Sequence, residues 1–252
     1  MAVAEHMTKR PEHVKHLFDA KAPNWSAKYA PNGRLTGRLA HFSAILDSHV
    51  AADGHILDLG CGTGDLARAM AAAGMRVTAC DISQQMLRCA VDLDPCCTVE
   101  WVHLDLNWRT LPFGSAIFDG VVAASVLEYV DEAADVLSEC ARVLRPGGTM
   151  VCTVPDPTHP VRWLEWLVGF SVRGPLAAAA ARHWPRFQGY LTYLRISLQR
   201  HRAGWWRTAA ARGGLFTVPC PAAAAAHTPL RMFVFQRPKE PSNDPKEMRN
   251  ST

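Results

Sequence analysis

A short apolar segment followed by three alternating glycines is the feature that most constrains the fold of this chain. Residues 56–59 have the pattern of a buried strand, and residues 66–70 have the pattern of a helix start. Gly60, Gly62 and Gly64 lie between them. A strand, a glycine turn and a helix start place backbone amides within reach of a nucleoside ligand. The sequence therefore predicts an α/β fold with a ligand site at this turn.

The spacing of these glycines argues against a dinucleotide ligand. The dinucleotide fingerprint has its third glycine five residues after the first, where this chain has Asp65. A carboxylate in the first helical turn also repels a pyrophosphate, which otherwise favours a helix N-terminus. A nucleoside cofactor with no phosphate and with a cationic centre fits this turn better.

Acidic residues end the next two predicted strands. Asp81 ends a strand over residues 76–81, and Asp105 lies near the end of a strand over residues 99–106. A carboxylate can accept two hydrogen bonds from a diol, so Asp81 is suited to a ribose. Asp119, at the start of a fourth strand, is interpreted as a structural residue rather than a ligand.

Over residues 35–156 the chain resembles the class I S-adenosylmethionine-dependent methyltransferases, in particular those that act on small molecules such as quinones and natural products. The glycine turn, Asp81 and the Arg-Pro-Gly-Gly turn at residues 145–148 carry the resemblance. It implies a Rossmann-like, doubly wound, mostly parallel seven-stranded sheet with an antiparallel edge pair and a helical cap. It also implies S-adenosylmethionine as cofactor and S-adenosylhomocysteine as product, with no metal. The expected cofactor-binding residues are Asp58, Gly60, Cys61, Gly62, Asp81, Ile82, Met86, Asp105, Leu106 and Ser125.

The resemblance extends to the N-terminus, where residues 18–29 are similar to a segment that closes over the site in this family. Trp25 and Tyr29 are four residues apart and share one face if the segment is helical. They would cover the methionine end of the cofactor. An amphipathic helix that packs on the core is the alternative interpretation.

The charge of the chain is uneven. Between residues 157 and 239 there are 12 lysines and arginines and a single acid, Glu165. The same region contains five of the eight tryptophans. Such a segment can cap an apolar or acidic organic substrate, lie on a membrane surface, or bind nucleic acid by stacking. We favour the cap, because the resemblance places a substrate cap after the fifth strand.

These patterns predict five regions. Lid helices occupy residues 1–34, the Rossmann-like core residues 35–156, the basic aromatic cap residues 157–214, the last two strands residues 215–237, and a disordered tail residues 238–252.

The candidates for catalysis are Glu128, His159 and Tyr29. A general base helps when the attacking group is a phenol, a hydroxyl or an activated carbon. Glu128 follows the fourth strand, where related enzymes often have Glu-His and this chain has Glu128-Tyr129. His159 follows the fifth strand, and we favour it because the ordinary pKa of histidine suits base chemistry near neutral pH.

The expected function is methyl transfer to the oxygen, carbon or nitrogen of a small organic acceptor, in the biosynthesis of a natural product, quinone or tetrapyrrole-like compound. An RNA methyltransferase and a non-catalytic nucleoside-binding scaffold are the alternatives. The acceptor can be acidic or carried by an acidic protein. No Asn/Asp-Pro-Pro-Tyr segment follows the fourth strand, which argues against DNA as partner. The cysteines do not have the spacing of a metal site, and no apolar run approaches the twenty residues of a membrane span. We therefore expect a cytoplasmic protein with reduced cysteines. Contact of the basic aromatic segment with a membrane surface stays open.

Overall fold

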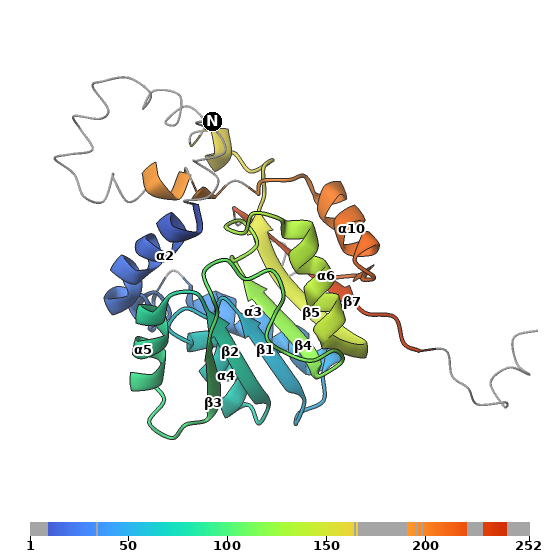
Figure 1. Ribbon diagram of the computed structural model, residues 1–252, viewed down its shortest axis with the longest axis horizontal. Coiled ribbons are helices and arrows are strands. Elements are labelled where there is room, and N and C mark those ends of the chain that lie inside the picture. The colour runs from blue at the N-terminus through green and yellow to red at the C-terminus, as the bar shows by residue number, and fades with distance from the viewer. Residues whose placement is uncertain are drawn as a thin grey trace, which may run out of the picture.

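A single seven-stranded sheet forms the centre of the molecule (Figure 1). The computed structural model describes residues 10–33, 35–163, 165, 191–194, 196, 197, 199–220 and 229–240. The strand order is β3-β2-β1-β4-β5-β7-β6. The strands are β1 (His55–Leu59), β2 (Arg76–Asp81), β3 (Val99–His103), β4 (Phe118–Ala124), β5 (Leu144–Pro155), β6 (Phe216–Val218) and β7 (Leu230–Gln236).

The first five strands are parallel, and β7 pairs antiparallel with both β5 and β6. The predicted mostly parallel sheet with an antiparallel edge pair is therefore confirmed. Two strand boundaries differ from the expectation. β3 ends at His103 rather than at residue 106, and β5 begins at Leu144, so it includes residues 145–148 that the sequence predicts as a turn.

Helices cover both faces of the sheet. Those described are α2 (Arg10–Lys21), α3 (Thr36–His49), α4 (Asp65–Ala72), α5 (Gln84–Asp92), α6 (Ala133–Val143) and α10 (Ala203–Arg212), with short 3-10 turns η1 (Ala22–Asn24) and η2 (Ser26–Lys28). Along β1, Ile56 packs in one apolar cluster with α3 and α4, while Leu57 and Leu59 pack in the other with α6 and α10. Both faces of β1 are therefore buried, as in doubly wound sheets. None of the helices described is long and apolar enough to cross a membrane.

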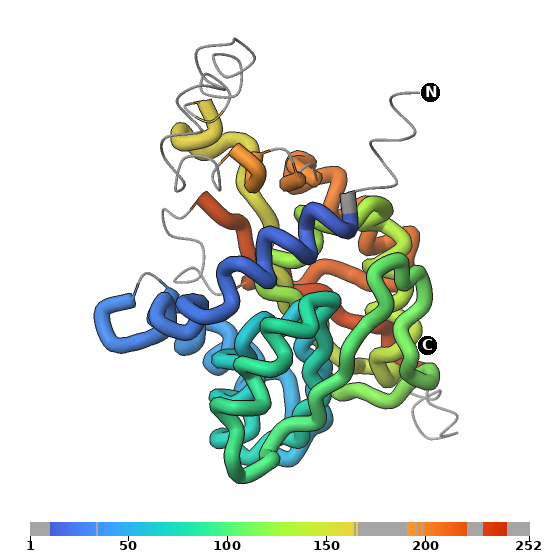
Figure 2. Tube along the Cα trace, turned by 60° about the vertical axis from the view of Figure 1, so that its left-hand side comes forward, coloured from blue at the N-terminus to red at the C-terminus, as the bar shows by residue number. Residues whose placement is uncertain are grey.

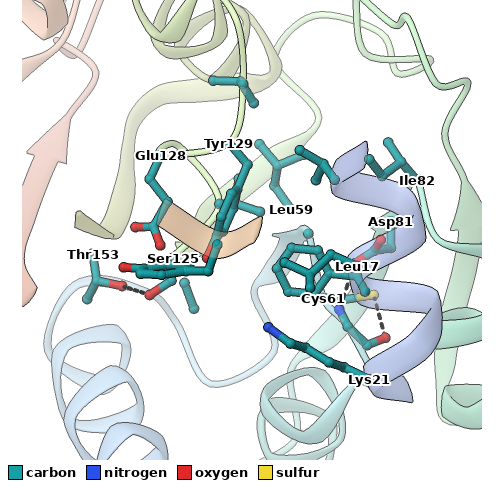
Figure 3. Close-up of a pocket in the computed structure, with 18 of the residues that line it drawn as sticks. Leu17, Lys21, Leu59, Cys61, Asp81, Ile82, Ser125, Glu128, Tyr129 and Thr153 are labelled. Atoms are coloured by element: carbon teal, nitrogen blue, oxygen red, sulfur yellow. Dashed lines mark hydrogen bonds between the residues drawn. The ribbon is translucent and has the colours of Figure 1, made fainter. Parts of the chain in front are cut away.

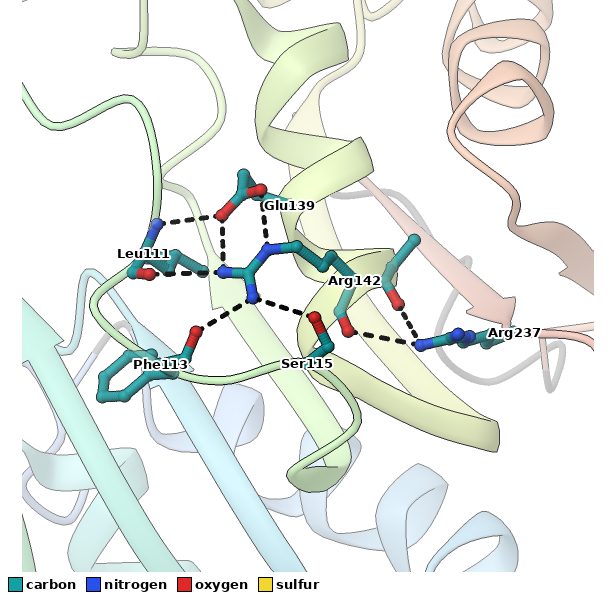
Figure 4. Close-up of polar contacts among 7 residues, drawn as sticks. Leu111, Phe113, Ser115, Glu139, Arg142 and Arg237 are labelled. Carbon is teal, nitrogen blue, oxygen red and sulfur yellow. Dashed lines mark hydrogen bonds and ion pairs between the residues drawn. The ribbon is translucent and has the colours of Figure 1, made fainter.

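Two arginines fix the end of α6 (Figure 4). Arg142 pairs with Glu139 at 2.8 Å and donates hydrogen bonds to the loop before β4, at Leu111 O, Phe113 O and Ser115 Oγ. Arg237, which follows β7, donates to the carbonyl oxygens of Ala141, Arg142 and Leu144. The last carbonyls of a helix lack intrahelical donors, so Arg237 both caps α6 and ties β7 to it.

Asp119 has the structural role expected of it. Its carboxylate accepts a hydrogen bond from the His55 amide at 2.8 Å and pairs with Arg145 at 2.6 Å. These contacts join the starting ends of β1 and β4 to the turn that enters β5.

The C-terminal part of the predicted cap packs on the sheet. Trp206 of α10 is 0 % exposed and belongs to the same apolar cluster as α6. Trp206 therefore belongs to the core, although it lies within residues 157–214, which the sequence predicts as a cap. Two of the tryptophans assigned to the cap, Trp166 and Trp184, lie outside the described residues, as do residues 1–9 and 241–252.

Replacement of Trp206 tests its place in the core. We expect Trp206→Ala to lower the free energy of unfolding by about 3–5 kcal/mol, because it leaves a large cavity. The matched control is Trp205→Ala in the same helix, where the side chain is 37 % exposed, and about 1 kcal/mol or less is expected. Urea unfolding measures both, and equal losses would contradict the assignment.

Candidate active site

A cavity of about 1720 Å³ opens at the carboxyl ends of β1, β2 and β4. Its walls come from the glycine turn, the end of β2, the loop after β4 and the N-terminal segment from α2 to η2. Figure 3 shows Cys61, Asp81 and Ile82 beside Leu17 and Lys21 on one side, and Ser125, Glu128 and Thr153 on the other. A pocket for one small ligand usually has about 300–1,000 Å³. This cavity therefore has room for two ligands.

Backbone hydrogen bonds to β2 hold the glycine turn. The amides of Gly60 and Cys61 donate to Cys80 O at 2.8 and 3.0 Å, and the Gly62 amide donates to Asp81 Oδ2 at 2.9 Å. Gly60 has φ of +70°, and a Cβ there would lie 1.8 Å from Val126 Cγ2. A side chain at this position would therefore push the turn away from the loop after β4.

Asp58 is a buried acid on the wall of this cavity. It is 2 % exposed, and its Oδ2 has no hydrogen-bond partner among the described residues. Burial, together with the negative charges of Asp81 and Asp65, raises the pKa of Asp58 to about 7. A cation bound in the cavity would relieve this cost, since an opposite charge favours the ionised form.

Asp81 lies at the end of β2 and lines the same cavity. Its carboxylate accepts hydrogen bonds from the amides of Gly62, at 2.9 Å, and Ser83, at 2.8 Å. Burial raises its pKa. A carboxylate offers about four acceptor positions, so Asp81 retains capacity for a ligand diol.

Eight of the ten expected cofactor-binding residues line the cavity: Asp58, Gly60, Cys61, Gly62, Asp81, Ile82, Leu106 and Ser125. Met86 is fully buried in α5, and Asp105 is exposed, so neither of them lines it. β3 ends at His103, and Leu104 is the residue that turns into the core beside Asp81, its amide bonded to Asp81 O. The side chain of Asp105 then faces outward.

The loop after β4 supplies the opposite wall. Ser125 has φ of +61°, and its hydroxyl lies 3.3 Å from Thr153 Oγ1 and accepts a hydrogen bond from Arg38 Nη2 at 3.1 Å. Glu128 is 2 % exposed, and burial raises its pKa to about 7, although Tyr129 and the nearby Arg162, Arg38 and Arg200 act in the other direction. An acid with this pKa can exchange a proton near neutral pH.

The three catalytic candidates are not brought together. Glu128 and Tyr29 line the cavity, and His159 does not. His159 Nδ1 accepts a hydrogen bond from the Val161 amide at 3.2 Å, within the loop after β5. Burial raises the pKa of Tyr29, while Arg38 beside it acts in the opposite direction.

The N-terminal segment from α2 to η2 forms one wall of the cavity, and Figure 2 shows the path of this segment in blue. Ser26 Oγ donates to Thr63 Oγ1 at 2.9 Å and lies 3.0 Å from Asp65 Oδ2, and Ser83 Oγ donates to Asp19 Oδ1 at 2.5 Å. Sequence reasoning did not identify these contacts. Ser83 carried a signal, because a serine before a helical pattern is a preferred N-cap; Ser26 carried none.

Replacement of Asp58 tests the buried charge. An acid whose pKa is raised on folding loses stability as the pH rises, here between about pH 4 and 7. We expect Asp58→Asn to be more stable than the parent protein, with an advantage larger at pH 8 than at pH 5 by about 1–3 kcal/mol. Urea unfolding at both pH values measures it, with exposed Asp47→Asn on α3 as control. If Asp58→Asn is more stable than the parent protein by the same amount at both pH values, ionisation of Asp58 is not the cause of the difference.

Known proteins with a similar sequence are methyltransferases. Residues 57–152 match the family model described as a methyltransferase domain. The chain is 32% identical over 205 residues to the demethylmenaquinone methyltransferase of Lactiplantibacillus plantarum, an alignment that covers 78% of this chain and 84% of that protein. It is also 32% identical over 153 residues to an uncharacterized methyltransferase of Mycobacterium tuberculosis, covering 58% of this chain and 77% of the relative.

Solved structures with lower sequence identity share the fold. The magnesium protoporphyrin IX methyltransferase of Synechocystis, solved with bound S-adenosylhomocysteine, has a TM-score of 0.65 at 18% identity, covering 89% of this chain and 98% of that one. The cyclase SpnF has a TM-score of 0.62 at 16% identity, covering 90% and 96%. The fold thus accommodates different reactions, and the sequence relatives decide the class. This chain belongs to the class I S-adenosylmethionine-dependent methyltransferases.

Proposed function

We propose that the protein transfers a methyl group from S-adenosylmethionine to a small organic acceptor, and that both bind in the cavity at the carboxyl edge of the sheet. The observation that carries the proposal is the pair of acids, buried Asp58 and half-buried Asp81, on either side of a glycine turn in a cavity large enough for two ligands. When bound, the cofactor supplies an electrophilic methyl group.

The residues present fit this cofactor. Asp81 would hold the ribose hydroxyls, and the unpartnered Oδ2 of Asp58 suits a positively charged amino group or sulfonium. Ile82 and Leu106 offer apolar walls for an adenine. Cys61 and the glycines supply the backbone of the turn. Met86 and Asp105 would act indirectly, Met86 by packing beneath the site, because neither side chain reaches the cavity.

The acceptor would lie between the turn and the loop after β4. The name of the Lactiplantibacillus relative refers to a quinone acceptor, which supports a ring compound with a phenolic oxygen or an activated carbon as the attacking group. Glu128 is positioned to take the proton of such a group. Tyr29 would orient the acceptor, with its hydroxyl beside Arg38. The place of His159 outside the cavity favours Glu128 as the base.

The proposal also includes a lid, a substrate cap and a cellular compartment. The segment from α2 to η2 acts as a lid that excludes water, and the described part of the predicted cap, which contributes Val161, Arg162, Glu165 and Tyr193 to the cavity, covers the acceptor. All eight cysteines are free thiols, which supports a reducing compartment such as the cytoplasm.

Substitution of Asp81 tests the ribose contact. We expect Asp81→Ala to weaken S-adenosylhomocysteine binding by about 2–3 kcal/mol, the scale of charge-assisted hydrogen bonds. Calorimetric titration measures the loss, with Asp47→Ala as control. Loss of Asp81 could weaken binding either by removing a contact to the ribose hydroxyls or by distorting the glycine turn. Titration with the 2′-deoxyribose analogue of the ligand distinguishes these two effects. If Asp81 binds the ribose, the alanine variant distinguishes the two ligands less than the parent protein does, whereas equal weakening of both would contradict the contact.

Substitution of Glu128 tests the base. With any phenolic acceptor that the parent protein methylates, we expect Glu128→Gln to lower kcat/KM at least about 100-fold. The rise of kcat/KM through about pH 7 in the parent protein should also disappear, since that limb reports deprotonation of Glu128. Exposed Glu12→Gln on α2 is the control. An unchanged pH profile in Glu128→Gln would exclude this role.

A further inference from the structure

One buried carboxylate is shared by two arginines beside the acceptor side of the cavity. Glu165 Oε2 accepts hydrogen bonds from Arg162 Nη1 and Arg200 Nη1, both at 2.7 Å. The side chains of Arg162 and Glu165 are only 7% and 6% exposed. A single carboxylate balances one guanidinium, so the group formed by Glu165 with Arg162 and Arg200, whose side chain is 24% exposed, carries an excess positive charge. Uncompensated buried charge is costly, which favours a bound counter-ion.

The guanidinium of Arg162 keeps a buried donor that has no partner among the described residues. Nη1 donates to Glu165 and lies 3.4 Å from the Tyr193 hydroxyl, and Nη2 donates to Pro229 O at 2.8 Å. Nε is buried and has no partner among the described residues. Arg162 lines the same cavity as Asp58 and Glu128. Buried N–H groups are nearly always hydrogen-bonded, so an acceptor atom of a ligand is expected here.

The charged side chains around Arg162 indicate the net charge of a ligand that binds there. Arg38, Arg162 and Arg200 all act electrostatically on Glu128, so among these described residues three cations face two acids, Glu128 and Glu165. The excess is one positive charge when both acids are ionised. A single negative charge matches this excess better than the two charges of a phosphate monoester.

Aromatic rings continue from this point along the cavity wall. The rings of Tyr129 and Tyr193 have centroids 6.4 Å apart, and Tyr129 contacts Phe18 of the lid edge-to-face at 5.1 Å. All three side chains line the cavity with Arg162. Edge-to-face rings of this kind pack well against a flat aromatic ligand.

We propose that Arg162 binds the carboxylate of an aromatic acid, and that such acids are the acceptors of this enzyme. Glu165 and Arg200 act as positioning residues that hold the guanidinium in place. The proposal rests on the proposed methyl transfer and narrows its acceptor, since a quinone has no formal charge and would leave the excess positive charge of Arg162 and Arg200 unbalanced.

The test measures binding of charged and uncharged forms of the same ring. Benzoate, 2-naphthoate and anthracene-2-carboxylate, each paired with its primary amide, are titrated calorimetrically into the full-length protein saturated with S-adenosylhomocysteine. We expect at least one carboxylate to bind at least 10-fold more tightly than its amide. A smaller preference in every pair, including binding of none of the six compounds, would overturn the proposal.

Variants then assign the preference to Arg162. In Arg162→Met the preference should fall at least 10-fold while affinity for the amide stays within about 3-fold, because the loss concerns charge and not ring packing. Exposed Arg212→Met on α10 is the matched control and should keep the preference. If Arg162 has only a structural role, Arg162→Met will lower Tm and leave the preference for the carboxylate over the amide unchanged. If Arg162→Met does not fold, Arg162→Lys, which lacks the planar fork, is expected to lose most of the preference; a full preference there would overturn the assignment.

The titration with S-adenosylhomocysteine alone separates the two proposals. Failure of that ligand to bind would overturn the methyl-transfer function itself. Binding of S-adenosylhomocysteine with no carboxylate preference would leave methyl transfer in place and overturn only the aromatic acid.

Discussion

The hydrogen bonds between the glycine turn and the end of β2 are the constraint on which the rest of the site depends. The parallel register of β1 and β2 pairs Leu59 with Cys80, so the turn after β1 meets the carbonyl of Cys80 and the carboxylate of Asp81. Positive φ at Gly60 and close approach to Val126 fix the path of the chain. The glycine turn also holds the N-terminal segment from α2 to η2 in place, because Thr63 and Asp65 at the end of the turn contact Ser26.

The cavity has opposite electrical character at its two sides. Near the turn, the buried Asp58 and the half-buried Asp81 are acids with raised pKa values, and such a place favours a cationic ligand. Beyond Glu128, Arg162 and Arg200 together exceed the charge of their shared partner Glu165, and such a place favours an anion. A cationic methyl donor and an anionic acceptor would each find the complementary side. This polarity would help to orient the two proposed ligands in the cavity.

The sequence was sufficient for the parts of the structure that depend on local spacing. The glycine turn, the seven strands and the position of Asp81 follow from short-range patterns, and the structure agrees with them. Asp105 could not be placed, because its direction depends on the residue at which β3 ends. His159 lies in a loop whose path is set by tertiary contacts of Asp156 with Thr158 and Arg231. The contacts of Ser26 with Thr63 and of Glu165 with Arg200 join distant segments and had no sequence signal.

Calorimetric titration of the purified protein with S-adenosylmethionine, with NADH as control, tests the assignment of the cavity most directly. The turn and its two acids predict selective binding of S-adenosylmethionine in the micromolar range. Binding of NADH with equal affinity, or no binding of S-adenosylmethionine to the folded protein, would contradict it.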